Sequence, residues 1–215
     1  MNYICIDTAR KHLEIVGQYQ GEELYYFDKS VLQHSVTLMP AIQNLMQGKD
    51  WGLIDYIGIN QGPGSFTGIR IGVTTAKVFS YIKDLKIIPF NSLEMYAYNI
   101  YSALGDTIIC AQASGNSQVY IAVYENQDAT PKELLSPKVL TKTEFERFLE
   151  LVDEPVLVAC DFDLPVTKAN FKTHFIQQCK TGIQRIMSQA KDRKFVKGNQ
   201  LEPLYIQIPQ AQKDL

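Results

Sequence analysis

Cysteine, histidine and long hydrophobic runs are scarce in this chain, and each shortage excludes a class of protein. The 215 residues include four cysteines, which are widely spaced, form no C-x-x-C pair and lie in mainly apolar segments. This distribution predicts buried free thiols in a reducing cytoplasm rather than a disulfide framework. The four cysteines are Cys5, Cys110, Cys160 and Cys179.

The histidines are too few and too far apart for a metalloprotease. A helical zinc site needs two histidines about four residues apart, whereas the only histidines are His12, His34 and His174. Ser65 lies between glycine-rich neighbours, but its surroundings read PGSFT and do not meet the G-x-S-x-G pattern of a nucleophile. We therefore expect no catalytic residue, no metal and no cofactor.

The hydrophobic segments are short, which argues against a membrane protein. None approaches the roughly 18 residues of a spanning helix, and the first residues, MNYICIDTARKH, lack the features of a signal peptide. We expect a cytoplasmic protein with no membrane partner.

The net charge of −2 and the pI of about 5.9 make a poor stand-alone nucleic-acid binder. The chain could still join an RNA-acting assembly whose basic surface comes from another subunit.

The order of the expected elements repeats once along the chain. The first half predicts three strands, a helix, a strand, a glycine loop, a helix, a strand and a helix. The second half predicts three strands, a helix, a strand and a helix, so its copy is degraded after Asp161. The first set spans 3–7, 12–19, 22–28, 31–47, 54–60, 67–82, 86–89 and 91–104, and the second 106–113, 118–125, 134–140, 141–152, 155–160 and 181–191.

Several local signals position these elements. Pro40 is expected to kink the 31–47 helix or to move its start toward Thr37. Thr141 with Glu144 forms a capping box at the start of a helix. The repeat predicts an α/β protein of two lobes, each a mixed sheet with flanking helices: an N-terminal lobe at 1–104 and a C-terminal lobe at 105–215.

The stretch Asn60–Gly72, NQGPGSFTGIRIG, resembles a phosphate-binding loop but fails both common fingerprints. The P-loop lysine is missing, because Gly68 is followed by Ile69 and Arg70. The G-x-G-x-x-G pattern of dinucleotide sites fails because Thr67 stands at its sixth position. A steric role explains more of the loop.

In the steric interpretation the loop is a sharp turn that starts a helix. Pro63 restricts Gly62, and Gly64 provides a positive φ. Ser65 or Thr67 caps the helix, and Phe66 anchors the turn in the core.

Small side chains recur every fourth residue along the helix after this loop. The resulting stripe permits close approach of another backbone, either within the chain or from a partner. With the two-faced 31–47 helix it predicts a dimer patch or a patch for a related partner. The candidate interface residues are Leu38, Met39, Ile42, Met46, Gly68, Gly72, Ala76, Phe79 and Ser80.

The glycine loop together with Ile6–Thr8 resembles the TsaB (YeaZ) family, which serves the synthesis of N6-threonylcarbamoyladenosine (t6A) at position 37 of ANN-decoding tRNAs. The ordered matches cover about the first 125 residues well and the last 15 weakly. The family loop is Gly62, Pro63, Gly64, Ser65, Phe66, Thr67, Gly68 and Arg70. The supporting matches are His34-Ser35, Leu38-Met39-Pro40, Ser92-Leu93-Glu94, Val119-Tyr120 and Glu202-Pro203-Leu204-Tyr205.

The resemblance implies the two-lobed actin-like, Hsp70-like, sugar-kinase-like (ASKHA) fold and a non-catalytic scaffold that pairs with a TsaD-like transferase. It further implies a TsaE-like ATPase that joins through the complex, a homodimer when alone, and only indirect contact with tRNA. In ATP-using members of this fold the turn after the first strand is glycine-rich. Here that turn reads Thr8-Ala9-Arg10-Lys11, which weakens the alternative of an ATP-binding or ATP-hydrolysing enzyme with Asp7 at a metal.

The chain departs from the family where an Asp-Ala-Arg-Arg-like stretch is usual. The matching positions are Ala113, Ser114, Gly115 and Asn116, and Gln118 replaces a glutamate. The chain therefore lacks those family charges, and residues 155–200 have no clear match. Arg70 is expected to meet solvent, Asp7 or a carboxylate of the partner.

Overall fold

The computed structural model describes residues 1–29, 33–100, 105–115, 117–127 and 130–206. Its first sheet has the strand order β3-β2-β1-β4-β5. The antiparallel strands are β1 (Tyr3–Asp7), β2 (Leu13–Tyr19) and β3 (Glu22–Asp28), and β4 (Tyr56–Asn60) and β5 (Lys86–Phe90) continue parallel to β1. The parallel part contains almost only buried residues, as the apolar runs of β1 and β4 predict.

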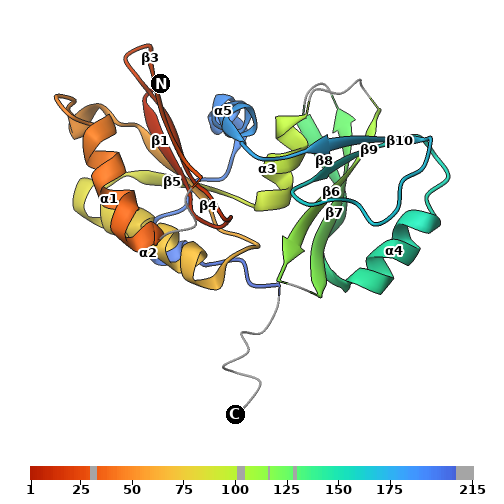
Figure 1. The fold of residues 1–215 in the computed structure, drawn as a ribbon. Coiled ribbons are helices and arrows are strands. Elements are labelled where there is room, and N and C mark those ends of the chain that lie inside the picture. Colours follow the sequence, from red (N-terminus) through yellow and green to blue (C-terminus); the bar gives the residue numbers. More distant parts are fainter. Residues whose placement is uncertain (30–32, 101–104, 116, 128–129, 207–215) are drawn as a thin grey trace. The chain divides into compact units, whose positions relative to one another are not determined.

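Three helices belong to the first run of elements, and Figure 1 shows two of them, α1 and α2, side by side. They are α1 (His34–Leu45), α2 (Phe66–Lys83) and α3 (Ser92–Asn99), with a short 3-10 helix η1 (Trp51–Leu53) between α1 and β4. α1 begins at His34 and continues through Pro40, so the alternative start near Thr37 is wrong. Residues 31–32 and 101–104 of the expected helices lie outside the described residues.

The second sheet has the strand order β10-β9-β6-β7-β8. Read from its other end, this order has the same arrangement as that of the first sheet. Its strands are β6 (Thr107–Ser114), β7 (Gln118–Gln127), β8 (Thr130–Thr141), β9 (Val156–Cys160) and β10 (Phe171–Phe175). β6, β7 and β8 form the antiparallel part, whereas β9 and β10 run parallel to β6. This duplication confirms the expected α/β architecture of two mixed sheets with flanking helices.

The second copy is degraded in one specific way. A helix, α2, connects β4 to β5 in the first copy, whereas the described residues 161–170 between β9 and β10 contain no helix. The sequence missed β10 altogether. The remaining elements are α4 (Lys142–Glu150), α5 (Lys180–Ser188), and the 3-10 helices η2 (Ala190–Asp192) and η3 (Gly198–Gln200), and α4 begins with the expected capping box of Thr141 and Glu144.

The chain forms two compact units, each with its own core. The first comprises Met1–Ser92 and Ile183–Tyr205, and Leu93–Gly182 forms the body of the second. Packing thus assigns the segment 183–205 to the first unit, although it follows the second sheet in sequence. β5 is the last strand of the first sheet in sequence, and β6 is the first strand of the second sheet. The boundary between the two lobes at residue 104, which rests on the order of the elements, stays a prediction. In the first core, α1 and α2 pack on the sheet, whereas α4 packs on the second.

Candidate functional site: the glycine loop, the turn after β1 and the helices α1 and α2

The glycine loop is a tight turn that rests on the backbone of the turn after β1. Gly62 has a φ of 107°, and a cis peptide bond joins it to Pro63. The Ser65 N–H donates to the Ala9 carbonyl at 2.7 Å. A Cβ on Gly64 would lie 2.0 Å from that same carbonyl oxygen, so only glycine fits there. The loop and the β1 turn are therefore packed backbone against backbone.

Ser65 caps α2, as one of the two sequence alternatives predicts, because its Oγ accepts the Gly68 N–H at 3.2 Å. Thr67 is exposed instead. Phe66 does not anchor the turn in the core, because it is only half-buried and packs on the Tyr205 ring at 5.2 Å between centroids. The steric interpretation of the loop is thus correct in its main features and wrong for Phe66.

The stripe of small residues on α2 is covered by the chain itself. Gly68 and Gly72 both pack on Thr8, and a Cβ on either would lie 2.0 to 2.3 Å from a Thr8 oxygen. Ala76 is fully buried, and Ser80 donates its hydroxyl proton to the Leu85 carbonyl at 2.7 Å. The close backbone approach that the stripe predicts is real, but the backbone belongs to the same lobe.

Most other candidate interface residues are also internal. Leu38, Ile42 and Met46 on and after α1 are at most 4% exposed. Phe79 is half-buried and stacks on Trp51 at 4.7 Å. Met39 remains 41% exposed. Apart from Met39, the candidate interface residues thus pack inside the first unit and hold α1 and α2 on the sheet.

A partly different set of apolar side chains on the same two helices faces outward, and the candidate interface residues included only Met39 of this set. On α2, Tyr81 is 91% and Ile82 66% exposed, and Val78 lies one turn before them. On α1, Val36 is exposed near Met39. The spacing of Val78 and Ile82 was visible in the sequence, but the pattern did not show which side of the helix the sheet covers.

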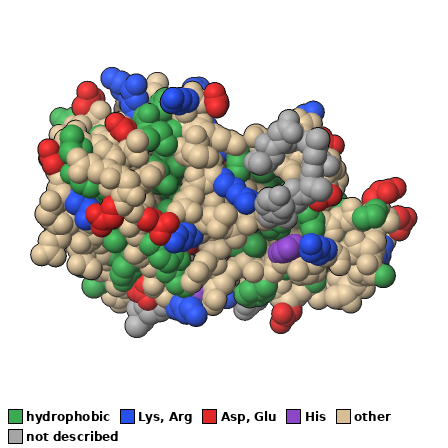
Figure 2. Space-filling view, turned by 90° about the horizontal axis from the view of Figure 1, so that it is seen from above, with side chains coloured by type: hydrophobic (Ala, Val, Ile, Leu, Met, Phe, Trp, Pro, Cys, Tyr) green, Lys and Arg blue, Asp and Glu red, His purple; other side chains and the backbone are tan. Residues whose placement is uncertain are grey.

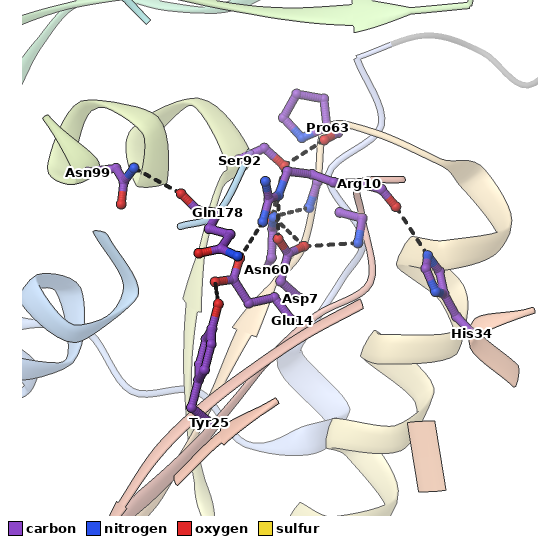
Figure 3. A network of polar contacts seen from close by, with 12 residues as sticks. Asp7, Arg10, Glu14, Tyr25, His34, Asn60, Pro63, Ser92, Asn99 and Gln178 are labelled. Atoms are coloured by element: carbon purple, nitrogen blue, oxygen red, sulfur yellow. Dashed lines mark hydrogen bonds and ion pairs between the residues drawn. The ribbon is translucent and has the colours of Figure 1, made fainter. Parts of the chain in front are cut away.

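A buried ion network closes the end of β1 (Figure 3). Arg10 donates from Nε to Asp7 Oδ2 and from Nη2 to Glu14 Oε2, both at 2.6 Å. The side chains of both carboxylates are 0% exposed and that of Arg10 is 3% exposed. The Tyr25 hydroxyl donates to the other Glu14 oxygen at 3.2 Å. A guanidinium of this chain therefore already binds the Asp7 carboxylate, to which the enzyme alternative gives a role at a metal.

Asn60 connects this network to the glycine loop. Its Nδ2 donates to Asp7 Oδ1 and to the Ser92 hydroxyl, both at 2.9 Å, and its Oδ1 accepts the Gly62 N–H at 3.0 Å. Ser92, the first residue of the family-like Ser-Leu-Glu run, donates to the Pro63 carbonyl at 2.7 Å. Buried polar groups need such partners. The amide thereby fixes the loop to β1 and to the start of α3.

Arg70 is exposed, as the solvent alternative predicts, and it also contacts two aromatic side chains of the chain itself. Its guanidinium stacks over the Phe66 ring at 3.8 Å, and its Nε donates to the Tyr205 hydroxyl at 3.0 Å. The Leu204 N–H donates to the Gln61 carbonyl at 2.7 Å, which holds the C-terminal Pro-x-Tyr segment against the loop. The weak C-terminal match of the sequence thus marks a segment that packs on the family loop.

The four thiols are buried, and His34 contacts the backbone of the turn after β1. All four cysteines are free and buried, as expected. Burial raises the pKa of the Cys160 thiol to about 11 and the pKa values of Cys5 and Cys110 well above their usual value. His34 Nε2 lies 3.1 Å from the Arg10 carbonyl oxygen at the start of α1. Among the described residues, no three metal-ligating side chains come together.

Arg10 and Glu14 were missed by sequence reasoning, although a signal exists. Arg10 lies in the turn between the buried strands β1 and β2, Glu14 lies within β2, and they follow Asp7 at spacings of three and seven. Of the family-departure positions, Asn116 lies outside the described residues. None of the helices in the described part of the chain has the length and hydrophobicity needed to span a bilayer.

Comparison with known proteins gives consistent matches. The family model described as TsaD, tRNA N6-adenosine threonylcarbamoyltransferase, matches residues 29–189. A Bacillus subtilis (strain 168) protein named tRNA threonylcarbamoyladenosine biosynthesis protein TsaB is 31% identical over 165 residues, which is 73% of this chain and 69% of that protein. The protein of the same name from Escherichia coli (strain K12) is 26% identical and covers 60% of this chain.

Coverage differs among these relatives. The chain spans only 57% of the Escherichia coli relative and 53% of one from Haemophilus influenzae.

A solved structure titled YeaZ from Pseudomonas aeruginosa is 18% identical, with a TM-score of 0.78, and covers 95% of this chain and 99% of that one. At that identity the likeness establishes the fold.

Proposed function

Since the chain belongs to the TsaB (YeaZ) family of tRNA threonylcarbamoyladenosine biosynthesis proteins, we propose that it is a non-catalytic scaffold subunit that pairs with a TsaD-like transferase. The transferase would form the threonylcarbamoyl group on A37 of ANN-decoding tRNAs. A TsaE-like ATPase would join through that complex. The chain alone would pair with a second copy through the same surface.

The observation that carries this proposal is the apolar surface on α1 and α2. Val36 and Met39 on α1, and Val78, Tyr81 and Ile82 on α2, are exposed on two adjacent helices. Exposed large apolar side chains on adjacent helices are typical of protein interfaces, where tyrosine and methionine are enriched. We call these five residues the outer surface of α1 and α2. The buried stripe behind it positions the helices.

Arg10 supports the non-catalytic part of the proposal. A metal at Asp7 would compete with a guanidinium that is already bound to two buried carboxylates. The turn around Arg10 also contains no glycine for close approach of a phosphate. The alternative of a weakly ATP-binding enzyme predicts ATP·Mg²⁺ binding that depends on Asp7. Calorimetry on the wild type and on Asp7→Ala tests that alternative directly.

Mixed charge supports indirect contact with tRNA. On the face in Figure 2, Lys and Arg side chains are interspersed with Asp and Glu. Phosphate backbones are bound most strongly by clustered basic side chains, and we assign that task to partner subunits.

Size-exclusion chromatography with light scattering tests the scaffold function. We expect a dimer for the chain alone and a one-to-one heterodimer when the TsaD-like protein of the same cell is added. A folded chain that stays monomeric with and without that protein would contradict the proposal.

A further inference from the structure

The buried network of Asp7, Arg10 and Glu14 contains two carboxylates and one cation. Asp7 Oδ2 and Glu14 Oε2 both accept from one edge of the guanidinium, at Nε and Nη2. Two buried carboxylates that lie this close to one another repel, and burial makes that repulsion expensive. The cation between them is therefore essential to this arrangement, and the chain supplies it from its own turn.

The network also extends to the loop that starts α2. Asp7 Oδ1 accepts from the Ala9 N–H at 3.0 Å and from Asn60 Nδ2 at 2.9 Å. The Ala9 carbonyl in turn accepts the Ser65 N–H, and Asn60 accepts the Gly62 N–H. A rotation of the Asp7 carboxylate would disturb both connections at once. The position of the glycine loop therefore depends on the group that fixes Asp7.

We propose that Arg10 is a positioning residue that acts as an internal cation: it fixes Asp7 and Glu14 and thereby sets the glycine loop and the start of α2 without any bound ligand. The inference concerns the first unit alone and is independent of the scaffold function. Figure 3 shows the arrangement, with Arg10 between the two carboxylates and Asn60 beside Asp7. In this chain the guanidinium does what a bound cation does in a ligand-dependent loop.

A consequence distinguishes an internal cation from an ordinary packing residue. Carboxylate and amide oxygens are the ligands that hard divalent cations prefer. In Arg10→Ala, a divalent cation added from solution should therefore replace the missing charge between Asp7 and Glu14. A residue that served only to fill space would not be replaceable by an ion.

The experiment compares the wild type with Arg10→Ala, using Mn²⁺ and Mg²⁺ as probes. Loss of the buried partner should lower the Tm of Arg10→Ala by roughly 5–20 °C. Mn²⁺ at about 100 times its Kd should restore roughly 5–10 °C of that loss. It should leave the wild type unchanged. Hydrogen exchange at the Gly62, Ser65 and Gly68 amides should accelerate in Arg10→Ala and slow again with Mn²⁺.

Three further variants complete the test. Arg10→Ala/Glu14→Gln lacks one carboxylate and should lose the Mn²⁺ response. Arg10→Lys keeps a cation and should keep slow loop exchange without Mn²⁺. Lys49→Ala removes the cation of a partly exposed ion pair, with Glu22 at 3.2 Å, and should show neither effect.

The outcomes that overturn the proposal are equally specific. One is an Arg10→Ala protein whose Tm and loop exchange do not respond to either ion, and another is an equal response in Arg10→Ala/Glu14→Gln. If Arg10→Ala does not fold alone, refolding with and without Mn²⁺ becomes the measurement. Failure to fold in both conditions then overturns the proposal.

Discussion

Thr8 and Gly68 are in direct contact across the first turn of α2. The Thr8 hydroxyl donates to the Gly68 carbonyl at 2.8 Å, and a Cβ on Gly68 would lie 2.0 Å from the Thr8 carbonyl oxygen. The helix therefore lies against the end of β1 at the closest distance that two backbones allow. Gly68, the residue that permits this contact, also belongs to the family loop.

We predict that Gly68→Ala destabilises the protein. The added methyl group gains about 1 kcal/mol of helix propensity, but overpacking against a backbone costs about 1–3 kcal/mol or more. Because the added Cβ would lie far inside van der Waals distance of the Thr8 carbonyl oxygen, α2 has to move away from β1. We therefore expect the free energy of unfolding, measured by chemical denaturation, to fall by about 2 kcal/mol. Thr74→Ala, on the exposed side of α2, should change stability by less than about 0.5 kcal/mol. Equal stability of the two variants would refute the close contact.

Asn60→Ala should be destabilising for a different reason. It leaves the Gly62 N–H, the Ser92 hydroxyl and one Asp7 oxygen without the partner that Asn60 provides. Buried polar groups that lose a partner cost about 1–3 kcal/mol each, so we expect a loss of roughly 3 kcal/mol or more. Asn44→Ala on the exposed side of α1 is the matched control. A loss below 1 kcal/mol would show that the amide does not connect the loop to β1.

The sequence predicted the elements well where the signal is local. The strands β1 and β9 are short apolar runs with clear boundaries, and both appear within a residue or so of the expected bounds. β10 was missed because its residues, FKTHF, are mostly exposed and it lies at the edge of its sheet. Its conformation comes from pairing with β9, which no local pattern reports.

The candidate site was harder to predict than the fold. Small residues at every fourth position of α2 show that something approaches closely, but not whether it is Thr8 of the same chain or a partner. Likewise, Glu14 in an alternating strand looks like a solvent position, whereas both faces of β2 are buried. Sequence periodicity gives one face of an element, and tertiary packing decides what lies on it.

Tyr81→Glu should abolish pairing while the protein stays folded. Tyr81 is 91% exposed, so the substitution removes no internal contact of consequence. In the proposed interface it would bury an unpaired carboxylate, at a cost of several kcal/mol, and weaken association at least a hundredfold. Light scattering and titration with the TsaD-like protein measure this effect.

The matched control for that experiment is Leu151→Glu, which changes an 82% exposed apolar residue in the second unit. It should leave association unchanged. If both variants associate as the wild type does, the outer surface of α1 and α2 is not the interface.

Acid should weaken the fold through His12. Burial and the nearby Arg10 charge lower the pKa of His12 below its ordinary value of 6.5. The unfolded chain then binds the proton more readily, so stability is full above pH 6.5 and decreases as pH falls toward the folded-state pKa. His12→Gln should flatten the dependence between about pH 7 and 5, measured by denaturation at each pH. An unchanged slope would exclude His12 as its source.

The cysteines should be unreactive in the folded protein. Their burial and the raised thiol pKa values of Cys5, Cys110 and Cys160 suppress the thiolate that reacts with alkylating reagents. We expect labelling of the native protein at pH 7 to be at least a hundred times slower than labelling in denaturant, where all four thiols react. Mass spectrometry counts the labels. Rapid native labelling of one thiol would reveal local opening.

The first lobe is completed by residues from the far end of the chain. Val196 and Ile87 exchange both backbone hydrogen bonds, at 2.9 and 3.0 Å, and Leu201 is buried in the core with β1 and α2. During synthesis from the N-terminus, the glycine loop therefore emerges well before the segment that covers it. The nascent first lobe carries an unfinished core until Val196 and Leu201 have left the ribosome. All strands of the second sheet are therefore synthesised before the first lobe can complete its core.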